Sequence, residues 1–176
     1  MTTHGAAEVA PIDEAVDHVS GASAPHMILE YGDYECPYSR AAYRQILRVQ
    51  RELDGGVGFA FRHFPLTAIH PHALAASAAA EAAAIQGRFW PMHDKLFRHQ
   101  GALVDQDLQR YAAELDLDVV RFNSDRESPR VMQRIGRDVQ SGLATGQVIG
   151  TPTLFVDGVV HLDGYAATEL VEALGQ

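Results

Sequence analysis

The stretch that decides the fold is YGDYECPYS, at residues 31–39. An apolar run typical of a strand leads into it at residues 26–31, and apolar residues at helical spacing follow at 41–49. Cys36 therefore lies where a strand and its turn lead into a helix. Pro37 suits the first turn of that helix, because the N–H that proline lacks would have no partner there.

The rest of the chain extends this pattern into one α/β domain. A second strand is expected at residues 57–64, and it should run parallel to the first because one helix connects them. Residues from about 66 to 145 are predicted to be a helical insertion that begins with an Ala-rich run. An Asp-Gly turn at 157–158 indicates a hairpin, and a terminal helix follows at 166–174. The sequence thus predicts the order βαβ, helical insertion, ββα in a single domain over residues 26–176.

Residues 1–25 are rich in Ala, Gly, Ser and Pro, and we predict an N-terminal arm that is partly disordered. Within it, Ile12, Val16 and Val19 could hold a short segment against the domain. The N-terminus has neither the basic nor the apolar region of a signal peptide. No run approaches the roughly 20 apolar residues of a membrane helix. We therefore expect a cytoplasmic protein that does not bind a membrane.

The charge balance argues against a nucleic-acid partner. The 176 residues include 14 basic and 23 acidic side chains, for a formal net charge of −9. Proteins bind phosphate backbones through Lys and Arg surfaces, and this sequence has no basic cluster.

The chain has a single cysteine, Cys36, so it cannot form an intramolecular disulfide. A lone cysteine is most often a small buried apolar residue. At a helix start, however, unpaired N–H groups and the helix dipole favour the thiolate and lower the thiol pKa from about 8.5. We therefore predict that Cys36 is a reactive, partly exposed thiol.

Two segments resemble the family of DsbA-type thiol-disulfide oxidoreductases. Residues 31–39 are similar to its active-site segment, which usually reads Cys-Pro-x-Cys, and residues 150–153, Gly-Thr-Pro-Thr, are similar to its cis-proline loop. The likeness covers about residues 18–174, and segments such as 87–93 resemble cytoplasmic members that stand alone or are fused to sodium/proton antiporters. This resemblance implies a thioredoxin fold with a DsbA-type helical insertion, and thiol-disulfide exchange.

Positions in this sequence that match the family's site have defined expected roles. Catalytic roles are implied for Cys36, Ser39 and Glu30, and substrate contacts for Pro37, Tyr38, Thr151 and Pro152. Glu30 lies on a strand expected to be mostly buried, where burial would raise its pKa and let it relay protons; the alternative is that it points to solvent. A cis Pro152 would leave the Thr151 backbone free to pair with an extended peptide; the alternative is that Pro152 starts an edge strand.

Position 39 departs from the family pattern, because Ser39 stands where a dithiol enzyme has its resolving cysteine. Such a chain can form a mixed disulfide at Cys36 but needs a second thiol to resolve it. We expect Ser39 to donate a hydrogen bond to the thiolate, and Asp33 and Glu35 to be solvated.

Three functions remain open: a monothiol oxidoreductase, a peptide-binding module without turnover, or an ordinary dithiol enzyme with an engineered Cys-to-Ser change. A kappa-type glutathione transferase shares the fold, but it typically has Ser at the first position of the active-site motif, where this chain has Cys36. We therefore rank that function below the other three. We expect no cofactor other than a small thiol such as glutathione or mycothiol as co-substrate. The expected partner is a cysteine-containing protein or a small thiol, and the expected assembly is a monomer or weak homodimer.

Histidines raise the question of a metal site. The candidates are His63, His70, His72, His93 and His99, and their spacing matches no recognised zinc pattern. We therefore expect no metal site, and we expect His63 or His93 to line the groove near the thiol.

Overall fold

The computed structural model describes residues 8–175, which build one five-stranded sheet of order β1-β3-β2-β4-β5. The strands are β1 (His18–Ser20), β2 (His26–Gly32), β3 (Val57–His63), β4 (Thr153–Val156) and β5 (Val159–His161). Strands β2 and β3 are parallel, and the other neighbours are antiparallel. The helix α1 (Pro37–Glu52) joins β2 to β3, so the predicted βαβ unit and the α/β thioredoxin fold are confirmed.

Side chains along β2 point alternately to the two faces of the sheet, and a separate part of the core lies on each face. Ile28 faces a large cluster that includes Ile46 of α1 and Leu170 of the terminal helix α7 (Ala167–Ala173). Leu29 and Tyr31 face a second cluster on the other side of the sheet. Because side chains alternate along a strand, Glu30 lies on the same face as α1. The sheet therefore directs a carboxyl group into the layer beneath the active-site helix.

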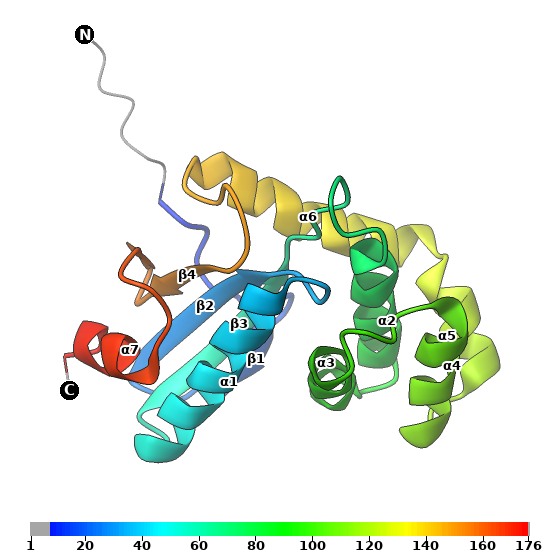
Figure 1. The fold of residues 1–176 in the computed structure, drawn as a ribbon, viewed down its shortest axis with the longest axis horizontal. Helices are drawn as coiled ribbons and strands as arrows, with labels where there is room; N and C mark the ends of the chain where they lie inside the picture. The colour runs from blue at the N-terminus through cyan, green and yellow to red at the C-terminus, as the bar shows by residue number, and fades with distance from the viewer. Residues whose placement is uncertain (1–7, 176) are drawn as a thin grey trace, which may run out of the picture.

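Five helices lie between β3 and β4: α2 (Ala73–Ile85), α3 (Phe89–Arg98), α4 (Asp105–Glu114), α5 (Val119–Arg126) and α6 (Pro129–Thr145). Figure 1 shows α2 to α5 beside the sheet, and α6 running back from them across the sheet. Helix α2 is buried over most of its surface, since its small alanines allow α3, α5 and α6 to pack closely around it. Within residues 8–175 no helix is both long and apolar enough to cross a bilayer.

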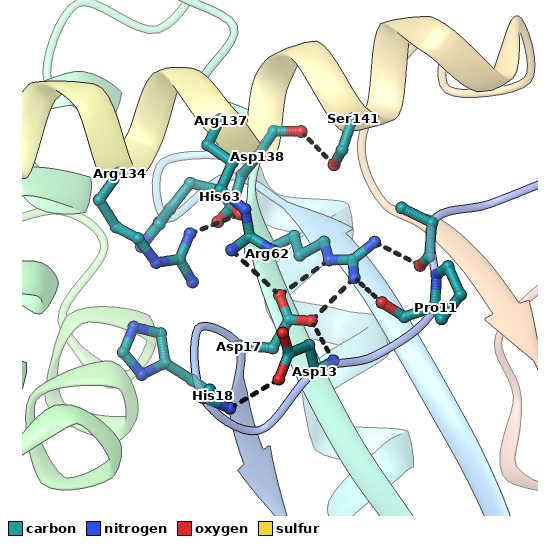
Figure 2. A network of polar contacts seen from close by, with 12 residues as sticks. Pro11, Asp13, Asp17, His18, Arg62, His63, Arg134, Arg137, Asp138 and Ser141 are labelled. Carbon is teal, nitrogen blue, oxygen red and sulfur yellow. Dashed lines mark hydrogen bonds and ion pairs between the residues drawn. The ribbon is translucent and has the colours of Figure 1, made fainter.

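The N-terminal segment differs from the predicted arm. Residues 1–7 lie outside the described residues, but His18–Ser20 form β1, paired with β3 in the register Val19↔Ala60. Arg62 of β3 holds the preceding residues: its guanidinium donates to the carbonyl oxygens of Ala10 and Pro11 and to both carboxylate oxygens of Asp17 (Figure 2). A strand of three residues has no clear periodicity, and it forms here because a buried ion pair anchors the chain beside it.

Candidate active site

Cys36 is the N-cap residue of α1, and Pro37 occupies the first helical turn, as the sequence predicts. The Cys36 side chain makes no capping hydrogen bond to the helix. The positive end of the helix dipole therefore faces the sulfur. This arrangement favours negative charge on Sγ when the thiol reacts.

The thiol is buried, which corrects the expected partial exposure. Cys36 is 3% exposed, and its Sγ donates a hydrogen bond to the carbonyl oxygen of Thr151 at 3.3 Å. The Thr151–Pro152 peptide bond is cis. The loop before β4 thus covers the sulfur, and a carbonyl can accept this bond only while the thiol keeps its proton.

Glu30 is fully buried, so the alternative that it points to solvent is wrong. Burial raises the pKa of Glu30 well above its ordinary value, and the neighbouring Ser39 hydroxyl offsets part of this shift. Gly32 leaves the room that the carboxyl needs, because a Cβ there would lie 2.7 Å from Glu30 Oε1. The site therefore holds a carboxylic acid that retains its proton at higher pH than an exposed glutamate.

Ser39 has a different partner from the one expected. Its Oγ accepts a hydrogen bond from the backbone N–H of Asp33 at 3.2 Å and lies beside Glu30. Ser39 is completely buried one helical turn after Cys36. Its hydroxyl therefore ties the turn before Cys36 to α1, and the bond to the thiolate that we expected is not among its hydrogen bonds in residues 8–175.

The acidic residues next to Cys36 are held by the loop after β3. Asp33 is fully buried, which corrects the expectation that it is solvated. Its Oδ2 accepts from the Leu66 N–H at 2.9 Å and pairs with His70 Nδ1 at 2.8 Å. Glu35 pairs in the same way with His72: its carboxylate accepts from the His72 backbone N–H and lies 2.9 Å from His72 Nδ1. Two acids that would oppose a thiolate are thus matched with imidazoles.

Gln100 is a site residue that the sequence did not indicate. Its Nε2 donates to the carbonyl oxygens of Tyr34 at 2.7 Å and Cys36 at 2.8 Å. One side chain from the loop after α3 therefore fixes both ends of the segment that carries the thiol. A lone glutamine more than 60 residues away in sequence offers no motif that would reveal this contact.

The other three candidate histidines, His63, His93 and His99, have contacts with residues other than Cys36. His63 and His93 are fully buried, so neither lines a groove at Cys36, contrary to our expectation. His93 Nδ1 is 2.7 Å from the Tyr34 hydroxyl within a cluster of aromatic rings, and burial lowers its pKa well below the ordinary value. His99 stacks on Tyr111. These contacts explain His93 and His99 through packing.

Comparison with known proteins assigns the family. The thioredoxin family model matches residues 14–175, and the chain belongs to this family. In sequence, it is 43% identical over 165 residues to the Na(+)/H(+) antiporter NhaA 1 of Salinispora arenicola, covering 93% of this chain. The chain spans about a quarter of the length of the curated relatives it matches, 25% in this case.

Solved structures agree with the family assignment. A thioredoxin-like oxidoreductase from Silicibacter pomeroyi DSS-3 has a TM-score of 0.80 and 26% identity, with 92% of each chain covered. Oxidised BdbD from Bacillus subtilis also has a TM-score of 0.80, at 21% identity over 98% of this chain and 97% of the other. The fold is therefore that of DsbA-type thiol-disulfide oxidoreductases, with one cysteine in the motif Cys36-Pro37-Tyr38-Ser39.

The buried Glu30 predicts a specific pH dependence of stability. Its folded-state pKa exceeds the unfolded value of about 4.5, so folding takes up a proton and stability falls as the pH rises from there toward the folded pKa. Glu30→Gln removes this titration. The free energy of unfolding of the Glu30→Gln protein, relative to that of the wild type, should therefore increase by up to about 1.4 kcal/mol for each pH unit in that window.

Urea titrations at a series of pH values measure this difference. Glu52→Gln is the matched control, because the Glu52 side chain is 46% exposed and its removal should leave the slope unchanged. Parallel curves for wild type and Glu30→Gln would contradict a raised pKa.

Gln100→Ala should loosen the active-site segment. The change leaves the Tyr34 carbonyl without the Gln100 donor and costs about 1–3 kcal/mol of unfolding free energy. Hydrogen exchange of residues 34–40 should accelerate. Gln86→Ala is the control, since Gln86 also bonds backbone atoms, those of Asp118, but in an exposed position. Equal losses in the two variants would contradict a special role for Gln100.

Proposed function

We propose that this chain is a monothiol thiol-disulfide exchange protein that works through a mixed disulfide at Cys36. The observation that carries this proposal is the lone thiol at the start of α1, in hydrogen-bond contact with the Thr151 carbonyl. The family supports thiol-disulfide chemistry, and the single cysteine restricts it to one covalent sulfur.

The exchange consists of two displacements. The Cys36 thiolate attacks one sulfur of a substrate disulfide, the S–S bond breaks, and the other substrate sulfur leaves as a thiolate that takes a proton from solvent. A second thiol, from a protein or from a small thiol such as glutathione or mycothiol, then loses its proton and attacks the substrate sulfur of the mixed disulfide. Cys36 leaves as the thiolate. The disulfide has been exchanged, with no net oxidation or reduction.

The surroundings of Cys36 favour a peptide as one substrate. Tyr38 is 62% exposed in the first turn of α1, and Ile149 is 92% exposed just before the Thr151 loop. Exposed apolar side chains near a reactive group commonly mark a contact surface. Displacing the Thr151 carbonyl from Sγ would open the thiol, and the loop backbone could then pair with an extended chain. In this proposal Glu30, beneath the helix, relays the proton that Cys36 loses before it attacks and regains after it leaves the mixed disulfide.

Intact mass spectrometry after exposure to oxidised glutathione tests the proposal. We expect one glutathione adduct per chain, its loss on addition of a small thiol, and no adduct on Cys36→Ser. A protein that forms no adduct but still binds cysteine-free peptides would instead be a binding module. A natively folded wild type whose Cys36 takes up no glutathione and that binds no peptide would contradict the assignment of the site.

A further inference from the structure

Outside the thiol site, one buried cluster brings together two imidazoles and a carboxylate. His18 of β1, His63 of β3 and Glu81 of α2 come from the N-terminal segment, the sheet and the helical insertion. Both Nε2 atoms lie 2.7 Å from the same oxygen, Glu81 Oε1, and all three donor atoms lie within 4.8 Å of one another. Exchange chemistry at Cys36 has no use for this cluster.

Among the ion pairs of residues 8–175, the carboxylate of the cluster has no lysine or arginine partner. Glu81 is 6% exposed, and its carboxylate lies between α2 and the sheet with both imidazoles against one oxygen. Two of the nearby arginines pair with other acids: Arg134 with Asp138, and Arg62 with Asp17 (Figure 2). Within residues 8–175 the ion-pair partners of Glu81 are the imidazoles of His18 and His63, and both of them contact the same carboxylate oxygen.

We propose that His18, His63 and Glu81 form a binding site for a divalent transition-metal ion, with Zn²⁺ the best match. Two imidazole nitrogens and one carboxylate oxygen are a ligand set that zinc and its neighbours accept. With metal–ligand distances of about 2.0–2.2 Å in a tetrahedral site, each Nε2 needs to move away from Glu81 Oε1 by only about 0.6 Å. When Nε2 binds the ion, it gives up the proton that it donates to Glu81 Oε1, and the ring proton is carried on Nδ1.

The site is open on one side. A cavity of about 490 Å³ is lined by His18 and Glu81 together with Val16, Ile85 and three arginines, Arg130, Arg134 and Arg137. Water or another small ligand can therefore complete the coordination from this cavity. His63 Nδ1 is buried without a hydrogen-bond partner in the described chain, so the outer support that tightens most metal sites is incomplete. We expect dissociation constants of about micromolar size.

Titration of the full chain with Co²⁺ tests the site directly. We expect saturable binding of one ion, visible absorption of a four-coordinate complex, and its displacement by Zn²⁺. At about 100-fold excess over the dissociation constant, Zn²⁺ should raise Tm by roughly 5–10 °C. Cys36→Ser should bind the ion as the wild type does, which separates this site from the thiol.

Three variants decide between a built site and stray histidine binding. His18→Ala and Glu81→Gln should weaken Co²⁺ binding by about 30-fold or more and remove the rise in Tm. His26→Ala is the matched control, because His26 pairs with Asp157 in a different part of the sheet. A wild type that binds no Co²⁺ overturns the proposal. So does a His18→Ala protein that keeps the wild-type affinity and has a native circular dichroism spectrum.

Discussion

Replacing Ser39 with cysteine should turn this chain into a catalytic dithiol oxidase. Residues three apart in a helix lie on one face with Cβ atoms roughly 5–6 Å apart, close enough for small adjustments to bring a second sulfur into bonding distance of Cys36. Ser39 is completely buried, and cysteine differs from it by one atom. Oxidised glutathione can then form a disulfide between Cys36 and the introduced cysteine, leaving as two reduced glutathiones. One thiolate of a dithiol peptide attacks Cys36 Sγ and breaks that disulfide, and the second peptide thiolate attacks the first and releases the oxidised peptide and the reduced protein. With oxidised glutathione as the oxidant, we expect oxidation of a dithiol peptide to increase by about 100-fold or more.

The matched control places a second cysteine elsewhere. Ser124→Cys adds a thiol on α5, which lies away from α1 in Figure 1 and should confer no turnover. Mass spectrometry reports the internal disulfide, and peptide oxidation reports the catalysis. A Ser39→Cys protein that forms the disulfide yet oxidises no peptide would show that Ser39 is not the only departure from the dithiol enzymes. It would favour the peptide-binding module.

Asp17→Ala should cause the largest loss of stability, about 3–5 kcal/mol in the free energy of unfolding. Arg62 is 1% exposed, and Asp17 accepts from its Nε at 3.0 Å and from its Nη2 at 2.8 Å. Burial would raise the pKa of Asp17, but the Arg62 hydrogen bonds bring it below its ordinary value. Removing the carboxylate leaves a guanidinium charge in the interior with only carbonyl and hydroxyl oxygens as acceptors.

Urea unfolding measures this loss, and Glu52→Ala provides the control. Glu52 also pairs with an arginine, Arg48, but both side chains are about half exposed, so that pair should contribute less than about 1 kcal/mol. The Asp17→Ala protein should also expose the segment around residue 10 to proteolysis. A loss as small as that of Glu52→Ala would mean that the N-terminal segment is held by apolar packing instead.

The sequence predicts the parts of this molecule that depend on local patterns. Apolar alternation, helical spacing and the Asp-Gly turn at 157–158 give the strand and helix order, because each is a property of neighbouring residues. The same reasoning places Cys36 at a helix start, since proline and the preceding turn mark that boundary. The similarity to the family adds the loop at Thr151, which local pattern alone leaves undecided.

The contacts that the sequence does not predict join residues far apart in the chain. Asp33 and Glu35 look like surface acids, and only the folded loop brings His70 and His72 to them across 37 positions. Gln100 reaches the Cys36 carbonyl in the same way. The expected exposure of the thiol is wrong for a related reason, because the loop that covers it comes from 115 residues away. Polar contacts between residues so far apart produce no repeating pattern in the sequence from which they could be predicted.

The most direct measurement follows a fully formed mixed disulfide between Cys36 and glutathione after all free thiol has been removed. The chain contains one cysteine, so a fully loaded protein holds no second thiol to release the adduct. We predict that the adduct persists without added thiol, and that its rate of loss rises in proportion to the thiol concentration. An adduct that disappears at the same rate with no thiol present would contradict the claim that this site needs an external thiol to complete exchange.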